Sequence, residues 1–367
     1  MVKKEIDLQK KLEYDRMQKK IRDALGLWVS KRKLDSFSSM KWLLKDIYDK
    51  RKTKTDLRYL GWEDPALAPF YLEEYRAPTS HSRYNLELIK AGDKKIEYDF
   101  AQAYTVIMMN YKLPSNTYLK NVKWDTEKVI RDRIFSYKEK KPYADLDTFM
   151  IFEVELKGKA KKGTYAHPKA QGMLSRYGNN LNIIGKPLTE IELKILVDYY
   201  DIERFVVLDS HVFKCRRGML AEYFERIEPL KTEPELQKLY KHMRTKVYGL
   251  IGQQKLSDSD KGFFNQPIYN RIFSAMVAGA FRDIMVRYEQ KYVDSPYGLI
   301  AIVTDGIYFK TEVPEFERLL KTGAVKKKEH IITLEEEQEA KKRMASQEKE
   351  NTVVVDKPKL RHTPELL

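Results

Sequence analysis

The chain has almost no cysteine and no long apolar run. Cys215 is the only cysteine among the 367 residues, which excludes a disulfide framework and a cysteine-based zinc site and fits a reducing compartment. No apolar segment is long enough to span a bilayer, and the N-terminus lacks the apolar core of a signal peptide. We therefore expect a cytoplasmic protein with no membrane partner.

Acidic residues are also in deficit. The 69 Lys and Arg residues outnumber the 54 Asp and Glu residues, which gives a net charge of +15. An excess of this sign favours a polyanionic partner, and nucleic acid is the candidate that needs no membrane. Aromatic residues make up 12% of the chain and include 24 tyrosines. Many are expected in the core, and others are available to stack on bases or sugars.

The charge pattern divides the chain into three parts. Residues 1–55 hold 17 basic and 8 acidic residues with helical apolar spacing. We predict a basic helical N-terminal extension there, which is either a solvated charged face or an arm that binds nucleic acid or a partner. Residues 56–325 are predicted to hold the main fold. Residues 326–367 are charged, and their last twenty or so residues are predicted to be disordered.

Strands and helices alternate within the main part. Thr189 and Glu192 have the spacing of a capping box, and the basic, glycine-containing run 157–163 is typical of a turn. The pattern predicts an α+β fold, with a small antiparallel sheet and helices packed on one side of it. The predicted strands are 96–100, 149–156, 205–208 and 211–213, with a hairpin around 304–305, and the predicted helices are 101–111, 193–199, 220–227, 233–251, 268–292 and 314–320.

Two acidic positions adjoin predicted strands about 200 residues apart. Asp99 lies near the end of strand 96–100, and Asp305 lies between the apolar segments 300–303 and 307–309. Taken alone, Asp99 is equally consistent with an N-cap of the next helix, and Asp305 with an Asp-Gly hairpin turn. Taken together, two neighbouring carboxylates can hold a pair of Mg²⁺ ions that stabilise the attacking and leaving oxygens of a phosphoryl displacement.

A predicted basic helix lies between the two acidic positions. Lys241 and Tyr248 are seven residues apart, so that they share one helix face, and Gly249 follows. Lys241 is suited to grip a triphosphate, and a glycine there would allow close backbone approach to a nascent base pair. Tyr104, five residues after Asp99, is placed to lie beneath a sugar and exclude a 2′-hydroxyl. The structural alternatives are a solvated lysine and a core tyrosine.

These residues resemble the motifs of the family B DNA polymerases, most closely the protein-primed branch of bacteriophages and linear plasmids. Residues 99–105 resemble the first motif, Asp-x-x-Ser-Leu-Tyr-Pro, residues 241–249 the second, Lys-x-x-x-Asn-Ser-x-Tyr-Gly, and residues 303–306 the third, Asp-Thr-Asp-Ser. The resemblance covers about residues 35–330. It implies a right-hand polymerase fold with an antiparallel palm sheet, helical fingers at about 215–265, an insertion at about 120–147, and a reduced or absent thumb.

The resemblance also implies roles for single residues. Asp99 and Asp305, with the backbone carbonyl of Phe100, would hold Mg²⁺, for which Mn²⁺ is a possible substitute. Asp99 and Asp305 would be catalytic through these ions. The implied nucleotide-binding residues are Tyr104, Lys241, Tyr248 and, in a looser register, Lys231 and Lys238. The implied partners are a DNA template and primer, deoxynucleotides, and a terminal protein or other replication proteins; a phage-encoded chain would work in the host cytoplasm.

The chain departs from the family pattern at several positions. Val303 replaces the first Asp of the third motif, so that Asp305 is the acidic ligand left there. Thr245 and Lys246 replace an Asn-Ser pair, and the extra positive charge is consistent with an unusual primer, such as a protein hydroxyl or RNA. The remaining replacements are Gly306 for a Ser and Thr105 for a Pro.

The sequence offers no place for a proofreading exonuclease. Only 98 residues precede Asp99, too few for the exonuclease domain that family members usually carry before the palm. Glu153 and Glu155 have the spacing of its Asp-x-Glu motif but follow Asp99, where the family has a palm strand. We therefore predict no intrinsic 3′–5′ exonuclease. The run 326–330 is interpreted either as a remnant of the primer-gripping thumb sequence or as a charged linker.

Three functions remain open. The first is a template-directed DNA polymerase that adds deoxynucleotides to a 3′-hydroxyl or a protein hydroxyl. The second is a primase-like or RNA-tolerant polymerase on the same palm, against which Tyr104 argues. The third is a catalytically degenerate replication protein that binds nucleic acid, against which the retention of Asp99, Lys241 and Asp305 argues.

Overall fold

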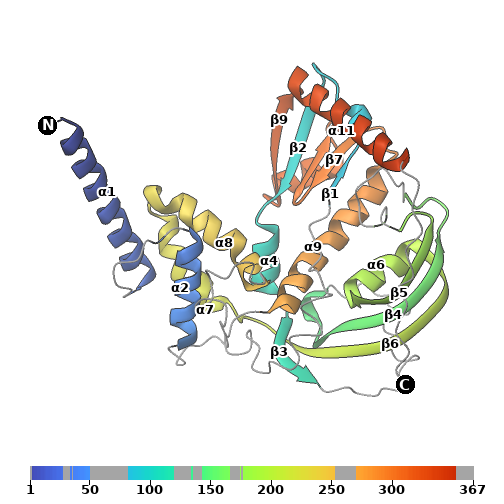
Figure 1. Cartoon of the computed structure of the whole chain (residues 1–367), viewed down its shortest axis with the longest axis horizontal. Helices are drawn as coiled ribbons and strands as arrows, with labels where there is room; N and C mark the ends of the chain where they lie inside the picture. The colour runs from blue at the N-terminus through green and yellow to red at the C-terminus, as the bar shows by residue number, and fades with distance from the viewer. Residues whose placement is uncertain are drawn as a thin grey trace, which may run out of the picture.

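The structure of the chain is a computed structural model (Figure 1). Of the predicted insertion at about 120–147, only residues 134 and 143–147 lie in the part of the chain that the structure describes. Residues 56–81 and the end of the predicted tail lie outside it. None of the described helices is both long enough and apolar enough to cross a membrane. The structure describes residues 2–27, 34, 36–49, 82–119, 134, 143–165, 174, 177–252 and 270–352.

A five-stranded antiparallel sheet carries both acidic positions, as the sequence predicts. Alternation along β2 buries Ile96 and Tyr98 and places Glu97 and Asp99 on the opposite face. The order is β1-β7-β8-β2-β9. The strands are β1 (Ser82–Tyr84), β7 (Leu299–Val303), β8 (Gly306–Phe309), β2 (Lys94–Phe100) and β9 (Val325–Ile331).

Aromatic rings fill the space beneath one face of this sheet. Tyr98 stacks on Phe316 of α10 (Pro314–Lys321) with ring centroids 5.0 Å apart. Phe100 meets Phe281 of α9 (Arg271–Tyr292) edge to face at 5.6 Å. Rings of this size dominate the burial energy of a core. The helices α9 and α10 therefore cover the Tyr98 face, opposite the face that carries Glu97 and Asp99.

Strand β9 corrects the interpretation of residues 326–330. The sequence analysis treats this run as a thumb remnant or a linker, but residues 325–331 pair with all of β2. Val325 is buried, Lys327 forms ion pairs with Glu312 and Glu317, and the other lysines alternate to the opposite face. Charged side chains on an edge strand are common because they discourage pairing with another chain. The domain boundary drawn at residue 325 thus falls inside the sheet.

A second, four-stranded sheet was not predicted as a separate sheet. Its order is β3-β6-β4-β5, formed by β3 (Leu113–Leu119), β6 (Tyr200–Arg216), β4 (Thr148–Ala160) and β5 (Asn180–Thr189). The long strands curve around α6 (Glu190–Tyr199) (Figure 1). The predicted capping box of Thr189 and Glu192 at the start of α6 is confirmed.

The predicted turn at 157–163 was wrong for residues 157–160, which continue β4. Gly158 explains the error, because its role is close strand approach and not a turn. A Cβ at this position would lie 2.4 Å from the backbone oxygen of Asp201 on β6. The sequence also predicted two separate strands at 205–208 and 211–213. In the structure both belong to the single strand β6.

The helices form one body with the sheets (Figure 1). The long helix α9 contacts α8 (Gln237–Gly252), α4 (Ala103–Asn110), α6 and β7. The N-terminal helices α1 (Val2–Leu25) and α2 (Ser36–Asp49) pack near α7 (Ala221–Ile227), where Arg226 pairs with Asp46 at 2.6 Å. The short helices η5 (Glu228–Lys231) and η6 (Pro234–Leu236) lead into α8, and α11 (Leu334–Thr352) follows β9.

Candidate active site

The fold brings the two distant acidic residues to neighbouring positions, Asp99 on β2 and Asp305 in the turn that leads into the adjacent strand β8. Asp99 lies opposite Gly306 in the pairing of β2 with β8, and Asp305 precedes Gly306 directly. The backbone N–H of Phe100 donates to the backbone oxygen of Asp305 at 2.9 Å. The spatial proximity on which a shared cation depends is therefore present, and the ligand roles of Asp99, Asp305 and the Phe100 carbonyl remain predictions.

The local structure decides the simple alternatives for the two aspartates differently. The N-cap of α4 is Gln102, so Asp99 is not the cap of that helix. Asp305 does lie in a hairpin turn, because it forms the β7–β8 turn together with Thr304, and Gly306 begins β8. The turn places Asp305 next to Gly306, the residue opposite Asp99.

Backbone strain marks both ends of the site. Gln102 and Thr304 have φ angles of 58° and 59°, and among the described residues they are the non-glycine residues with positive φ. Such conformations cost about 1–3 kcal/mol each and persist only where the surrounding structure imposes them. One follows Asp99 by three residues and the other precedes Asp305. Sequence patterns gave no sign of either, because Gln and Thr are not typical of this conformation.

Burial raises the pKa of both aspartates. For Asp99 the burial effect is the largest, Glu97 raises the pKa further, and Lys328, Lys326 and Lys241 lower it. For Asp305 burial again leads, and the charges of Asp99 and Glu97 raise its pKa while Lys241 lowers it. Like charges held together in a half-buried site favour the binding of a cation, because the cation removes their repulsion.

Helix α8 presents Lys241 to both carboxylates. Lys241 is exposed and its charge acts on Asp99 and on Asp305. Gly249 lies two turns further along, and a Cβ there would have no neighbour within 4 Å. No protein atom requires a glycine at this position, and the space is open to a ligand. The predicted role of Gly249 beneath a nascent base pair stays a prediction.

The two other predicted lysines lie further along the chain towards the N-terminus. Lys231, at the end of η5, is 3.3 Å from Glu228 and largely exposed. Lys238 lies in the first turn of α8 and is exposed. Neither is among the charges that most influence Asp99 or Asp305. Their predicted contacts with a nucleotide remain predictions.

Tyr104 and Tyr248 form a stacked pair next to Asp305. Their ring centroids are 4.6 Å apart with an interplanar angle of 16°, and Tyr104 also meets Phe281 edge to face. Burial is the largest cause of the raised pKa of both tyrosines, and the charge of Asp305 raises it further. Tyr104 is only 7% exposed. It is a core residue at the floor of the site, and its role in sugar discrimination stays a prediction.

Hydrogen bonds fix α8 relative to its neighbours. The buried hydroxyl of Thr105 on α4 donates to the backbone oxygen of Arg244 at 3.1 Å. Ser274 of α9 donates to the backbone oxygen of Tyr248. The backbone N–H of Asn270, the N-cap of α9, donates to the backbone oxygen of Ile251 on α8 at 2.9 Å. These bonds set the position of the Lys241 face opposite the sheet.

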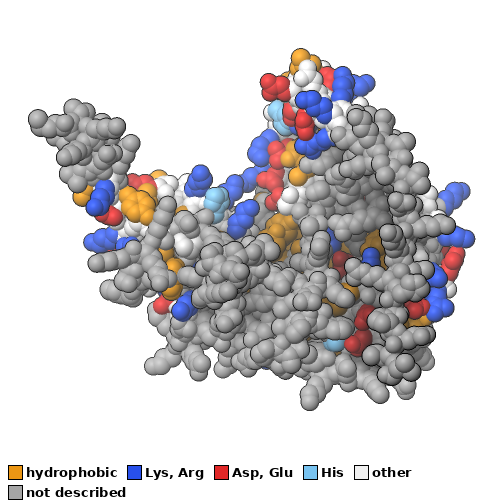
Figure 2. All heavy atoms as spheres, in the orientation of Figure 1, with side chains coloured by type: hydrophobic (Ala, Val, Ile, Leu, Met, Phe, Trp, Pro, Cys, Tyr) orange, Lys and Arg blue, Asp and Glu red, His pale blue; other side chains and the backbone are white. Residues whose placement is uncertain are grey.

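Two lysines of β9 were missed by the sequence reasoning as part of this site. Lys326 lies opposite Asp99, and Lys328 lies opposite Glu97. In the strand every second residue of 325–331 faces the same side of the sheet, but this lysine-rich run carries no local signal of a strand. Figure 2 shows Lys and Arg side chains over α8 and along the β9 side of a notch in the surface. The site is thus flanked by positive charge on both sides.

The donor set fits Mg²⁺ or Mn²⁺ in kind. Both ions prefer oxygen ligands, and a site that uses one or two carboxylates together with substrate phosphates is typical of Mg²⁺. Asp99, Asp305 and the Phe100 carbonyl are such donors. Within the described part of the chain, no group of three or more His, Cys, Asp and Glu residues is arranged to hold a metal. A cation here would therefore depend on these two carboxylates, with the substrate completing its coordination.

Solved structures of a DNA polymerase share this fold. Phi29 DNA polymerase in complex with primer-template DNA matches with a TM-score of 0.55 and 16% sequence identity, over 81% of this chain and 51% of that chain. Its ternary complex with primer-template DNA and incoming nucleotide substrates matches with a TM-score of 0.54 and 17% identity, over 80% of this chain and 51% of that one.

The chain spans about half the length of that polymerase. No family model matches the sequence, and no curated protein is significantly similar to it. At this level of identity the likeness shows a shared fold.

Proposed function

We propose that the chain is a template-directed DNA polymerase that adds deoxynucleotides to a 3′-hydroxyl or a protein hydroxyl and has no intrinsic proofreading exonuclease. One observation carries the proposal. Asp99 on β2 lies next to Asp305 in the turn before β8, and the charge of Lys241 acts on both, in a fold shared with a polymerase solved in complex with primer-template DNA and nucleotides.

In this proposal the five-stranded sheet is the palm of the right hand. Helices α7 and α8, with η5 and η6 between them, are the fingers, and the thumb is reduced or absent. Glu155 supports the absence of an exonuclease site at 153–155, because it forms an ion pair with Arg204 at 2.8 Å on the second sheet. A carboxylate neutralised in this way is poorly suited to hold a catalytic cation.

The reaction would be an in-line displacement at the α-phosphate. Mg²⁺ bound by Asp99, Asp305 and the Phe100 carbonyl would supply charge stabilisation for the attacking and leaving oxygens. Lys241 would bind the triphosphate from the α8 side, and Lys326 and Lys328 would attract the backbone of the primer from the β9 side. Positioning and electrostatic stabilisation supply most of the rate in such transfers.

The stacked tyrosines would form the floor of the nucleotide site. Tyr104 cannot move without disturbing Tyr248 and Phe281, on which its ring packs. A rigid ring beneath the sugar discriminates against a 2′-hydroxyl by shape. This arrangement favours deoxynucleotides and argues against the primase-like alternative.

Primer extension by the purified full chain tests the proposal. We expect templated addition of the complementary deoxynucleotide with Mg²⁺, and with Mn²⁺ as a substitute. Preferential addition of ribonucleotides would favour the primase-like function. DNA binding without extension in either ion would favour the degenerate replication protein, for which Val303 is the motivating observation. Comparing a DNA primer with a protein hydroxyl then identifies the priming group.

A further inference from the structure

Glu97 is a carboxylate that none of the assigned roles uses. It lies two residues before Asp99 on β2 and therefore projects from the same face of the sheet. Its cross-strand neighbours are Tyr308 on β8 and Lys328 on β9. The Glu97 side chain is only 16% exposed. Its charge is thus largely shielded from water and lies one step along the strand from the proposed cation site.

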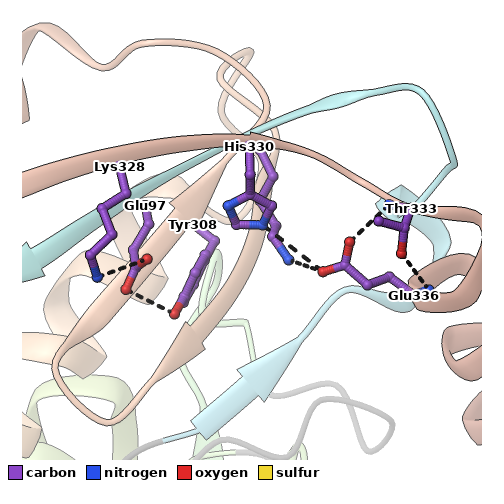
Figure 3. Close-up of polar contacts among 7 residues, drawn as sticks. Glu97, Tyr308, Lys328, His330, Thr333 and Glu336 are labelled. Atoms are coloured by element: carbon purple, nitrogen blue, oxygen red, sulfur yellow. Dashed lines mark hydrogen bonds and ion pairs between the residues drawn. The ribbon is translucent and has the colours of Figure 1, made fainter.

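Two donors hold the Glu97 carboxylate in place (Figure 3). The Tyr308 hydroxyl donates to Oε1 at 3.2 Å, and the Lys328 ammonium donates to Oε2 at 3.3 Å. Each carboxylate oxygen therefore has its own partner on a neighbouring strand. This geometry holds the negative charge on the sheet face that also carries Asp99.

The Tyr308 ring has a further contact, with Lys95. The Lys95 ammonium lies 5.7 Å from the ring centroid and forms an ion pair with Glu336 at 2.7 Å. Glu336 in turn accepts from the N–H of Thr333 at 2.9 Å and donates its own N–H to the Thr333 hydroxyl at 3.1 Å. Figure 3 shows the contacts of Glu97 with Tyr308 and Lys328 and, beside them, those of Glu336 with Thr333.

The charge of Glu97 reaches both proposed ligands. It raises the pKa of Asp99 and of Asp305, whereas Lys328 lowers that of Asp99. A pair of divalent cations carries four positive charges, and two aspartates balance only half of them. A third fixed negative charge nearby therefore lowers the free energy of the cation-bound state.

We propose that Glu97 is a third carboxylate of the site, which strengthens cation binding at Asp99 and Asp305 through its charge and without touching the ion. This inference rests on the proposed function, since it assumes that Asp99 and Asp305 bind the cation. In this proposal Glu97 is not a ligand of the ion, and it acts on the site only through its negative charge.

Mn²⁺ binding to the full chain without DNA, followed by electron paramagnetic resonance, tests the inference independently of activity. Glu97→Gln is expected to weaken Mn²⁺ affinity about 3- to 10-fold, because a nearby charge is lost. Glu329→Gln is the matched control. It makes the same change on the same sheet, but Glu329 lies opposite Ile96 and so belongs to the other face. The Mn²⁺ affinity of the Glu329→Gln variant should therefore equal that of the wild type.

Lys328→Met provides a second variant with the opposite sign. It removes the positive charge that offsets Glu97 and Asp99, so that Mn²⁺ should bind more tightly. Wild-type affinity in a folded Glu97→Gln protein overturns the inference. If that variant does not fold, unchanged or weaker binding by Lys328→Met overturns it. Asp99→Asn in the same titration separates the two claims, because wild-type Mn²⁺ binding by this variant contradicts the proposed function itself.

Discussion

Burial of Asp305 beside Asp99 destabilises the folded chain at neutral pH. The pKa of Asp305 is raised above its ordinary value of 3.8, chiefly by burial. A carboxyl with a raised pKa in the folded state favours folding when protonated, and this advantage is lost as the pH rises through the folded-state pKa. Functional sites commonly carry such a cost.

Asp305→Asn should therefore raise the melting temperature at pH 7. The gain should shrink as the pH falls from the raised pKa of the folded state towards 3.8, because the wild-type carboxyl then becomes protonated in the folded chain and its buried charge is lost. Thermal melts of both proteins from pH 7 to pH 4, without divalent cations, measure this difference. A lower melting temperature for the variant at pH 7 would show that the ionised Asp305 is stabilised by contacts other than those described.

Tyr104 permits a test of sugar discrimination. Tyr104→Ala should raise the incorporation of ribonucleotides relative to deoxynucleotides, because the ring that would lie beneath the sugar is removed. Its loss should also cost about 3–5 kcal/mol of stability, as is typical of a buried aromatic residue. Tyr104→Phe keeps the ring and should keep the discrimination. The ratio of the two incorporation efficiencies is the measurement, and an unchanged ratio in Tyr104→Ala contradicts the assigned role.

Elements with a clear period were predictable from the sequence, and elements defined by partners were not. The strand that ends near Asp99, the hairpin before Gly306 and the capping box at Thr189 all carry local signals, and all are present. Strand β9 has a lysine-rich sequence whose strand character depends on pairing with β2. The second sheet depends on a close approach at Gly158, which resembles a turn signal in the sequence.

The residues of the candidate site also divide into those with a local sequence signal and those that depend on their neighbours in the fold. The sequence pattern identified Asp99, Asp305 and Lys241, and the fold brings them together. It gave no reason to connect Glu97 or Lys328 with Asp99, because they are linked through pairing between strands and not through chain spacing.

Helix α8 offers a test that separates stability from function. Gly249 lies within the helix, and a Cβ there would meet no protein atom within 4 Å. Gly249→Ala should therefore stabilise the chain by about 0.5–1 kcal/mol, since glycine weakens helices relative to alanine. It should at the same time reduce nucleotide incorporation if the nascent base pair lies against this position.

Urea unfolding compares the stability of Gly249→Ala with that of the wild type, and primer extension on the same preparations compares their activity. A variant that is more stable and fully active would show that no ligand approaches the helix at this point.

The charge of the whole molecule predicts how it binds DNA. With a net charge of +15 and basic side chains over α8 and along β9 (Figure 2), binding should release counterions from the DNA. The affinity for primer-template DNA should fall at least about tenfold between 50 and 200 mM salt. Fluorescence anisotropy titrations at several salt concentrations measure the slope. An affinity that is flat over this range contradicts an electrostatic mode of binding.

Loss of template-directed extension in two aspartate variants tests the central claim most directly. Asp99→Asn and Asp305→Asn should each abolish extension with Mg²⁺ while the proteins remain folded by circular dichroism. Asp93→Asn is the matched control, because Asp93 precedes β2 and pairs with Lys310 at 2.7 Å, and it should extend primers as the wild type does. Full extension by both Asp99→Asn and Asp305→Asn would contradict the account.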